Sequence, residues 1–161
     1  MHRVAPPSID SVLSTHRLRR LAGALTLAVT LASAPLAHAD DQDAIDYRRH
    51  IMKTMGEEAA IVGMILKQKA PAESFATHMQ ILAVAAATAK KAFEPKVAGG
   101  DSKPEVWAQW PDFAKRLDAL VAATDDLAKT AQQGGVAAAG PKVSTALTCK
   151  GCHDTYRVPK K

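Results

Sequence analysis

A five-residue motif near the end of the chain restricts the fold more than any other feature of the sequence. It is Cys149-Lys150-Gly151-Cys152-His153. An α-helix turns about 100° per residue, so side chains at positions i, i+3 and i+4 share one face. Two thiols and an imidazole in this spacing are typical of covalent attachment of a c-type haem. The motif therefore predicts a helix here, with Cys149, Cys152 and His153 on its haem-facing side.

Two other uses of a C-x-x-C spacing fit the sequence less well. A disulfide-exchange site is expected near a strand-to-helix junction, and no strand pattern precedes this motif. A zinc site would need further ligands at matching spacing, and the chain has only these two cysteines. We therefore predict one haem c per chain, attached covalently through Cys149 and Cys152, with His153 as the proximal iron ligand.

The first 39 residues are predicted to be a cleaved signal peptide and not part of the fold. Four arginines give a basic start, an apolar run covers residues 21–34, and a small-x-small cleavage site ends at Ala39. The apolar run is too short for a retained membrane span, and acidic residues follow it. The mature protein, residues 40–161, is therefore expected without a membrane span in an oxidising compartment, most simply the periplasm of a bacterium.

Removal of this segment changes the interpretation of the charge. The whole chain has a net charge of +5, whereas residues 40–161 hold 17 Lys and Arg against 15 Asp and Glu, a net charge of +2. No dense basic stripe with interleaved aromatic residues remains, so we expect no binding to nucleic acid. The mature length suits one domain. With both cysteines used for haem, cohesion must come from packing and from the haem itself.

The mature segment favours helix throughout, because it is rich in Ala, Leu, Met, Lys and Gln and lacks β-branched runs. Proline and glycine divide it into four predicted helices, with Pro111 favouring a break in the third and residues 134–141 forming a linker before the fourth. Their ranges are about 42–67, 72–93, 105–133 and 142–158. Apolar residues recur at helical spacing in the first two: Ile45, Met52, Met55, Ala59, Val62 and Leu66, then Phe75, Met79, Leu82, Ala86 and Ala89.

Four amphipathic helices with short connections predict an all-α fold, an antiparallel four-helix bundle with the haem in its interior. Together with a signal peptide and a single C-terminal C-x-x-C-H, this pattern resembles the class II c-type cytochromes, the cytochrome c′ family, including its Met-ligated low-spin relatives. The likeness covers essentially all of residues 42–158. The segments that carry it are Tyr47-Arg48 followed by Met52, Gly99-Gly100-Asp101, Lys103-Pro104-Glu105-Val106-Trp107, and the haem motif continuing through Asp154-Thr155-Tyr156-Arg157.

The resemblance implies a role for Met52 on the distal side of the iron. In the family, a methionine at this position either coordinates the iron or only covers it, and the sequence leaves both readings open. Met55 stands one turn along the same face and could substitute for it. Met64 and Met79 are expected to fill the core.

The resemblance also gives three arginines a place near the haem. Arg48 matches a position at the haem edge, where a guanidinium can pair with a propionate. Arg49 replaces the glutamine usual in the family, and its cation could still meet a carboxylate. Arg157 lies at i+4 from His153 and resembles a basic residue beside the proximal histidine; the alternative is a solvated cation favourable to the helix dipole.

Two functions of different classes follow from this site. The first is electron transfer in the periplasm with an unidentified redox partner. The alternative is a five-coordinate cytochrome c′ that binds nitric oxide or carbon monoxide. Enzymatic activity is not expected, because peroxide cleavage calls for a polar acid-base pair where this chain offers Met52. A homodimer through the first two helices is implied by the resemblance alone.

Overall fold

The structure is a computed structural model that describes residues 40–159. The predicted signal peptide, residues 1–39, lies outside the described residues. The described residues all fall within one compact unit of the chain. Among them, no helix combines the length and apolar character needed to cross a bilayer.

The first helix, α1, spans Asp41–Leu66, within a residue of the prediction at each end. Its N-cap is Asp40, whose carboxylate accepts a hydrogen bond of 2.8 Å from the Asp43 amide. Acidic side chains in the first turn also interact favourably with the helix dipole. Its buried residues include a charged one: Arg48 is only 2% exposed.

The second helix, α2, spans Phe75–Phe93 and follows a short 3₁₀ turn, η1, at Ala72–Ser74. It packs against both α1 and α4. Five alanines on it are buried, which lets neighbouring helices approach closely. The whole predicted apolar stripe is buried: Phe75, Met79, Leu82, Ala86 and Ala89.

A one-turn helix, α3, spans Glu105–Ala108, and the long helix α4 spans Trp110–Ala146. The chain breaks at Gln109, so Pro111 does not interrupt a helix but stands in the first turn of α4. A missing N–H has no cost at that position, because the first amides of a helix have no intrahelical acceptor. The break predicted near Pro111 is therefore present two residues earlier.

The predicted linker at residues 134–141 and the fourth helix at 142–158 are both partly wrong. The chain reverses within α4 at Gly134 and Gly135, where Gly135 has φ +58°, and helix resumes directly through Pro141 to Ala146. The three alanines after Val136 favour helix, and burial of Ala139 stabilises the helix against its neighbours. A new interruption at residues 147–148 separates this limb from α5, Cys149–Tyr156.

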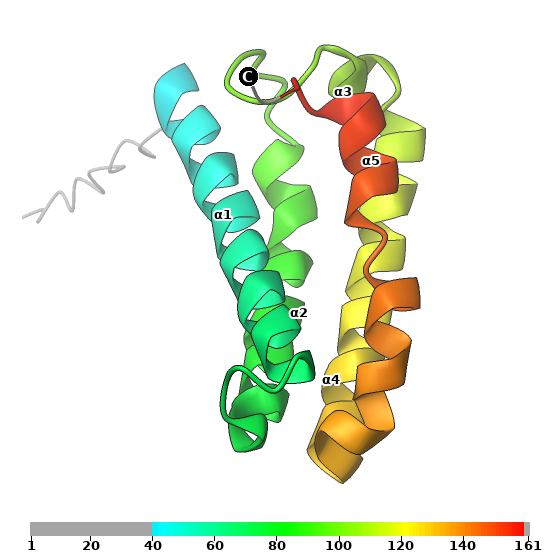
Figure 1. Cartoon of the computed structure of the whole chain (residues 1–161). Helices are drawn as coiled ribbons and strands as arrows, with labels where there is room; N and C mark the ends of the chain where they lie inside the picture. Colours follow the sequence, from blue (N-terminus) through cyan, green and yellow to red (C-terminus); the bar gives the residue numbers. More distant parts are fainter. Residues whose placement is uncertain (1–39, 160–161) are drawn as a thin grey trace, which may run out of the picture. The chain divides into compact units, whose positions relative to one another are not determined.

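Figure 1 shows the resulting four-helix bundle, which confirms the predicted fold class. Helix α1 and the first limb of α4 run in one direction, whereas α2, the second limb of α4 and α5 run in the other. No strand is present among residues 40–159, only two isolated β-bridges. Met79 fills the core as predicted, but the prediction for Met64 is wrong, since it is 47% exposed.

A loop between α2 and α3, residues 94–104 and here called the rim loop, fastens α1 to α5. The guanidinium Nη2 of Arg48 donates to Gly99 O at 2.7 Å. On the other side, Lys103 N donates to Tyr156 O at 3.0 Å, and Val158 N donates to Asp101 O at 2.9 Å. The rim loop therefore joins two helices that are distant in sequence at one end of the bundle.

Candidate haem-binding site

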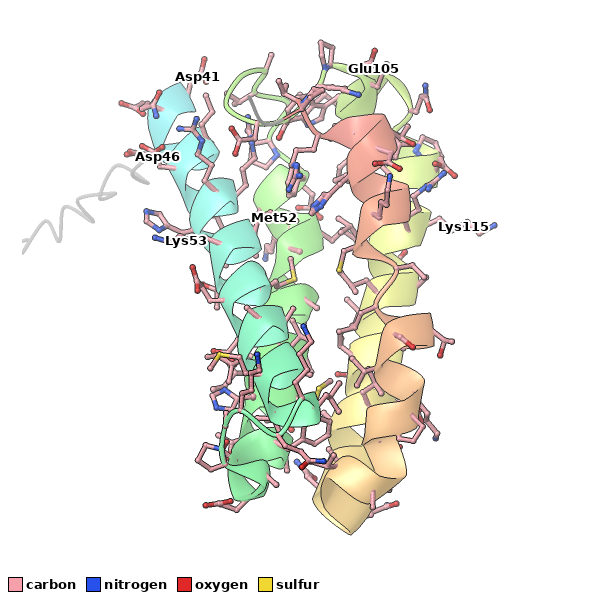
Figure 2. All side chains as sticks on the ribbon, in the orientation of Figure 1. Asp41, Asp46, Met52, Lys53, Glu105 and Lys115 are labelled. Atoms are coloured by element: carbon pink, nitrogen blue, oxygen red, sulfur yellow. The ribbon has the colours of Figure 1, made fainter. Side chains whose placement is uncertain are left out.

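A cavity of about 660 Å³ opens between α1 and α5, a volume within the range of cofactor pockets. Helix α1 contributes Met52, labelled in Figure 2 on the side of α1 that faces the other helices. Helix α5 contributes Cys152 and His153 from the attachment motif. Aromatic side chains form much of the remaining wall: Phe93, Phe113 and Tyr156.

The attachment motif, which is the C-x-x-C-H sequence of residues 149–153, lies on α5. The helix predicted at this position is therefore present. Cys152 and His153 are half-buried and line the cavity. Cys149 is exposed at the start of α5 and lines a smaller neighbouring groove that Cys152 also borders. Both thiols are free. Burial raises the pKa of the Cys152 thiol, and the nearby Arg116 charge acts in the opposite direction.

The structure separates the two methionines that could serve the distal side. Met52 lines the cavity, whereas Met55 is buried in the core and takes no part in the cavity lining. Ala60, about two turns beyond Met52 along α1, also lines the cavity, and Ala59 does not. Met52 is therefore the methionine of α1 that shares this space with His153.

Arg48 brings an incompletely satisfied cation to the cavity wall. Its Nη2 is bonded to Gly99, but within the described part of the chain its buried Nε and Nη1 have no hydrogen-bond partner. The guanidinium lies 5.9 Å from the Phe93 ring and 5.2 Å from the Trp107 ring. Burial, reinforced by repulsion from Arg49, lowers the pKa of Arg48. A buried cation with two unpaired hydrogen-bond donors is costly. An anionic group bound in the adjacent cavity would pair with it.

The other two predicted arginines lie at the cavity mouth. Arg49 is partly exposed and forms ion pairs with Asp46 at 3.5 Å and Asp101 at 3.8 Å. Arg157 is half-buried, lines the cavity, and pairs with Ser102 of the rim loop in a β-bridge. Both cations therefore line the cavity, without the burial that isolates Arg48.

Comparison with known proteins identifies this arrangement. A family model described as cytochrome c′ matches residues 43–157. The chain belongs to the cytochrome c′ family. Over 128 residues it is 29% identical to a cytochrome c′ of Alcaligenes xylosoxydans xylosoxydans, covering 76% of this chain and 98% of that protein.

Solved structures of the same family agree with this cytochrome c′ fold. A nitric oxide complex of a mutant cytochrome c prime from Alcaligenes xylosoxidans has a TM-score of 0.66 at 28% identity, covering 76% of this chain and 99% of that one. A carbon monoxide complex of another variant has a TM-score of 0.65 at 28% identity, covering 75% and 98%.

Membership of the cytochrome c′ family implies a covalently bound haem c, and the residues present fit such a group. The cavity has aromatic walls for a flat apolar ring, the Cys152 thiol and the His153 imidazole from one helix, and the unsatisfied donors of Arg48 for a carboxylate. The Cys149 thiol lies in the neighbouring groove that Cys152 also borders. Among residues 40–159, no cluster of three His, Cys, Asp or Glu side chains forms a separate metal site.

Sequence reasoning missed a polar network that holds α5 in this cytochrome c′ fold. The Tyr156 hydroxyl, in a side chain only 3% exposed, donates to Asp112 Oδ2 at 2.6 Å. Arg116 Nε donates to the same carboxylate oxygen at 2.7 Å, and its Nη1 donates to Gly151 O at 3.0 Å. The i, i+4 spacing of Asp112 and Arg116 is visible in the sequence, but not the helix that they face.

The network also shifts two pKa values in this cytochrome c′ homologue. Burial, and then the hydrogen bond to Asp112, raise the pKa of Tyr156. The hydrogen bonds from Tyr156 and from Arg116 lower the pKa of Asp112. Both shifts favour a neutral phenol that donates to a charged carboxylate.

Proposed function

We propose that this protein is a periplasmic monohaem cytochrome that transfers electrons, with its haem attached through Cys149 and Cys152. One observation carries the proposal: a single cavity receives Met52 from α1 and the pair Cys152 and His153 from α5. When bound, the haem supplies a reversible one-electron iron couple, whose potential histidine–methionine ligation raises.

The chain's own residues would hold and shield that group. The two thiols of α5 would anchor it, and the His153 imidazole of α5 and the Met52 thioether of α1 would face it across the cavity that both line. Arg48 Nε and Nη1 would donate to a haem carboxylate, which would satisfy the two donors that lack a partner among residues 40–159. Phe93, buried beside Arg48, helps to exclude water. We propose no catalytic role, because α1 presents a thioether and not a histidine to the distal side.

Optical spectra of the purified oxidised and reduced protein test this proposal, with Met52→Ala as the decisive variant. If Met52 coordinates the iron, the wild type is low-spin. The substitution then lowers the reduction potential and greatly increases carbon monoxide binding, because it removes one axial ligand. A high-spin wild type that binds carbon monoxide readily contradicts coordination by Met52.

Gas binding is the second candidate function, and it is supported by the relatives. Two structures that are 28% identical to this chain are a nitric oxide complex and a carbon monoxide complex of cytochrome c prime. The small side chain of Ala60 in the cavity wall would leave room for a diatomic ligand. This function becomes the better reading if Met52 only covers the iron.

We also propose a homodimer through α1 and α2. Four large hydrophobic side chains are exposed on these helices, which fits an interface between copies of the chain: Tyr47, Met64, Ile81 and Val84. Sedimentation of the wild type and of Val84→Lys tests this, since Val84 is 57% exposed and the charge should dissociate a dimer without disturbing the core. A monomeric wild type contradicts the proposal.

A further inference from the structure

We propose that Asp112 and Arg116 are positioning residues that fix the rotation of α5, and therefore the direction of the His153 imidazole. This inference rests on the proposed haem attachment. The two side chains lie one turn apart on α4 and hold α5 at two points, Gly151 and Tyr156. These points flank Cys152 and His153, the two motif residues that line the cavity.

The two contacts restrain α5 in different ways. Arg116 Nη1 binds a backbone oxygen at Gly151, between the two cysteines, whereas Asp112 binds the side-chain hydroxyl of Tyr156 at the last turn. The Arg116 guanidinium also lies 5.6 Å from the Tyr156 ring centroid, which links the two contacts. One backbone contact and one side-chain contact, five residues apart, restrain both sliding and rotation of the helix.

The rim loop and the Arg116 side chain form hydrogen bonds with opposite halves of α5. Among residues 40–159, the rim loop forms hydrogen bonds with the C-terminal half of α5, from Lys103 N to Tyr156 O and from Lys103 Nζ to Asp154 O. At the other end, the interruption at residues 147–148 separates α5 from α4, so the helix before it does not set its rotation. The hydrogen bond from Arg116 to Gly151 therefore lies in the other half of α5, next to the interruption at residues 147–148.

A small rotation of α5 would matter greatly for an axial ligand. Helical side chains extend to about 5–6 Å from the helix axis, so a rotation of about 20° moves their tips by roughly 2 Å. Metal–ligand distances tolerate only about 0.2 Å. The network thus acts on the precision of the site, while its partly exposed ion pair adds little to global stability.

The experiment compares Asp112→Asn and Tyr156→Phe with a matched control, Asp118→Asn. Asp118 is also a partly exposed carboxylate of α4, but the cation that donates to it at 2.9 Å is Lys90 of α2. Covalent haem content is measured first in each purified holoprotein. The readouts are then the electron paramagnetic resonance spectrum of the ferric protein and amide hydrogen exchange of residues 149–157.

We expect all variants to retain covalent haem and wild-type helix content. Asp112→Asn and Tyr156→Phe should give broadened lines or a second set of g values, and exchange in α5 should be about 2- to 10-fold faster, as expected for loss of one hydrogen bond. Asp118→Asn should match the wild type. Because Tyr156→Phe removes no charge, a spectral change shared by Tyr156→Phe and Asp112→Asn does not come from the lost charge of Asp112.

Two results would overturn the inference. One is a pair of variant spectra that superimpose on the wild type even though exchange or stability changes, which would make the network merely structural. The other is an equal spectral change in Asp118→Asn. A wild type without covalent haem would instead refute the proposed function, and the haem measurement detects that before any variant is compared.

Discussion

Replacing Arg48 with methionine tests whether the cavity holds an anionic group. If a haem carboxylate pairs with the buried Nε and Nη1, the substitution breaks a buried ion pair, which costs about 3–5 kcal/mol of unfolding free energy. Without a carboxylate, the substitution loses the hydrogen bond to Gly99, about 1.5–3 kcal/mol, and relieves two unsatisfied donors at about 1–3 kcal/mol each. These effects oppose each other, and the net destabilisation would be small or absent. We expect the larger loss.

Guanidinium chloride unfolding of the holoprotein, followed by far-ultraviolet circular dichroism, measures this difference. Arg49→Met is the matched control, because Arg49 is the next residue, carries the same charge, and makes only partly exposed ion pairs. Its loss should stay below about 1 kcal/mol. If Arg48→Met also loses less than about 1 kcal/mol with haem attached, no carboxylate pairs with Arg48 and the reasoning fails.

Three further perturbations test other parts of the site. The double variant Cys149→Ala/Cys152→Ala should yield protein from which acid-acetone extracts the haem, with reduced helix content; retention of non-extractable haem would refute the assignment. Gly100→Ala should lower the unfolding free energy in urea by about 1–3 kcal/mol, because φ is +62° and the new carbon would lie 2.9 Å from a side chain of α1; an unchanged midpoint would contradict this. The hydrogen bond from Tyr156 and the nearby guanidinium lower the pKa of Asp112, so the stability difference between wild type and Asp112→Asn should be full above about pH 4 and shrink as the pH falls; a difference independent of pH would exclude this linkage.

The first two helices could be predicted closely because strong local signals bound them. Pro71 precedes η1 and α2, Pro95 follows α2, and an aspartate at position 40 caps α1. The fourth helix could not, because Gly135 supplies a sharp reversal that needs no linker. Pro141 predicted a boundary, but the chain passes it as helix, since packing of neighbouring residues outweighs the local cost.

The site itself divides in the same way. The C-x-x-C-H motif is local, so its helix and the position of Cys152 and His153 at the cavity could be predicted from spacing alone. Spacing did not predict that Cys149 would lie in the neighbouring groove. The hydrogen bonds of Arg48 with Gly99 and of Tyr156 with Asp112 join residues 44 or more positions apart. No local sequence pattern shows which faces of distant helices will pack together. The resemblance to the family placed Arg48 near the haem edge, but it did not show the two unpaired donors.

The rim loop has a consequence for the order in which the protein folds. Arg48 and Gly99 are 51 positions apart, and Lys103 and Tyr156 are separated by a similar stretch of chain. Closing such long segments has a large entropic cost, which the packing of adjacent helices must first offset. We therefore expect the cavity rim to form late, after α1, α2 and α4 have assembled, so that a group already attached to α5 enters an open bundle and is enclosed in the last step.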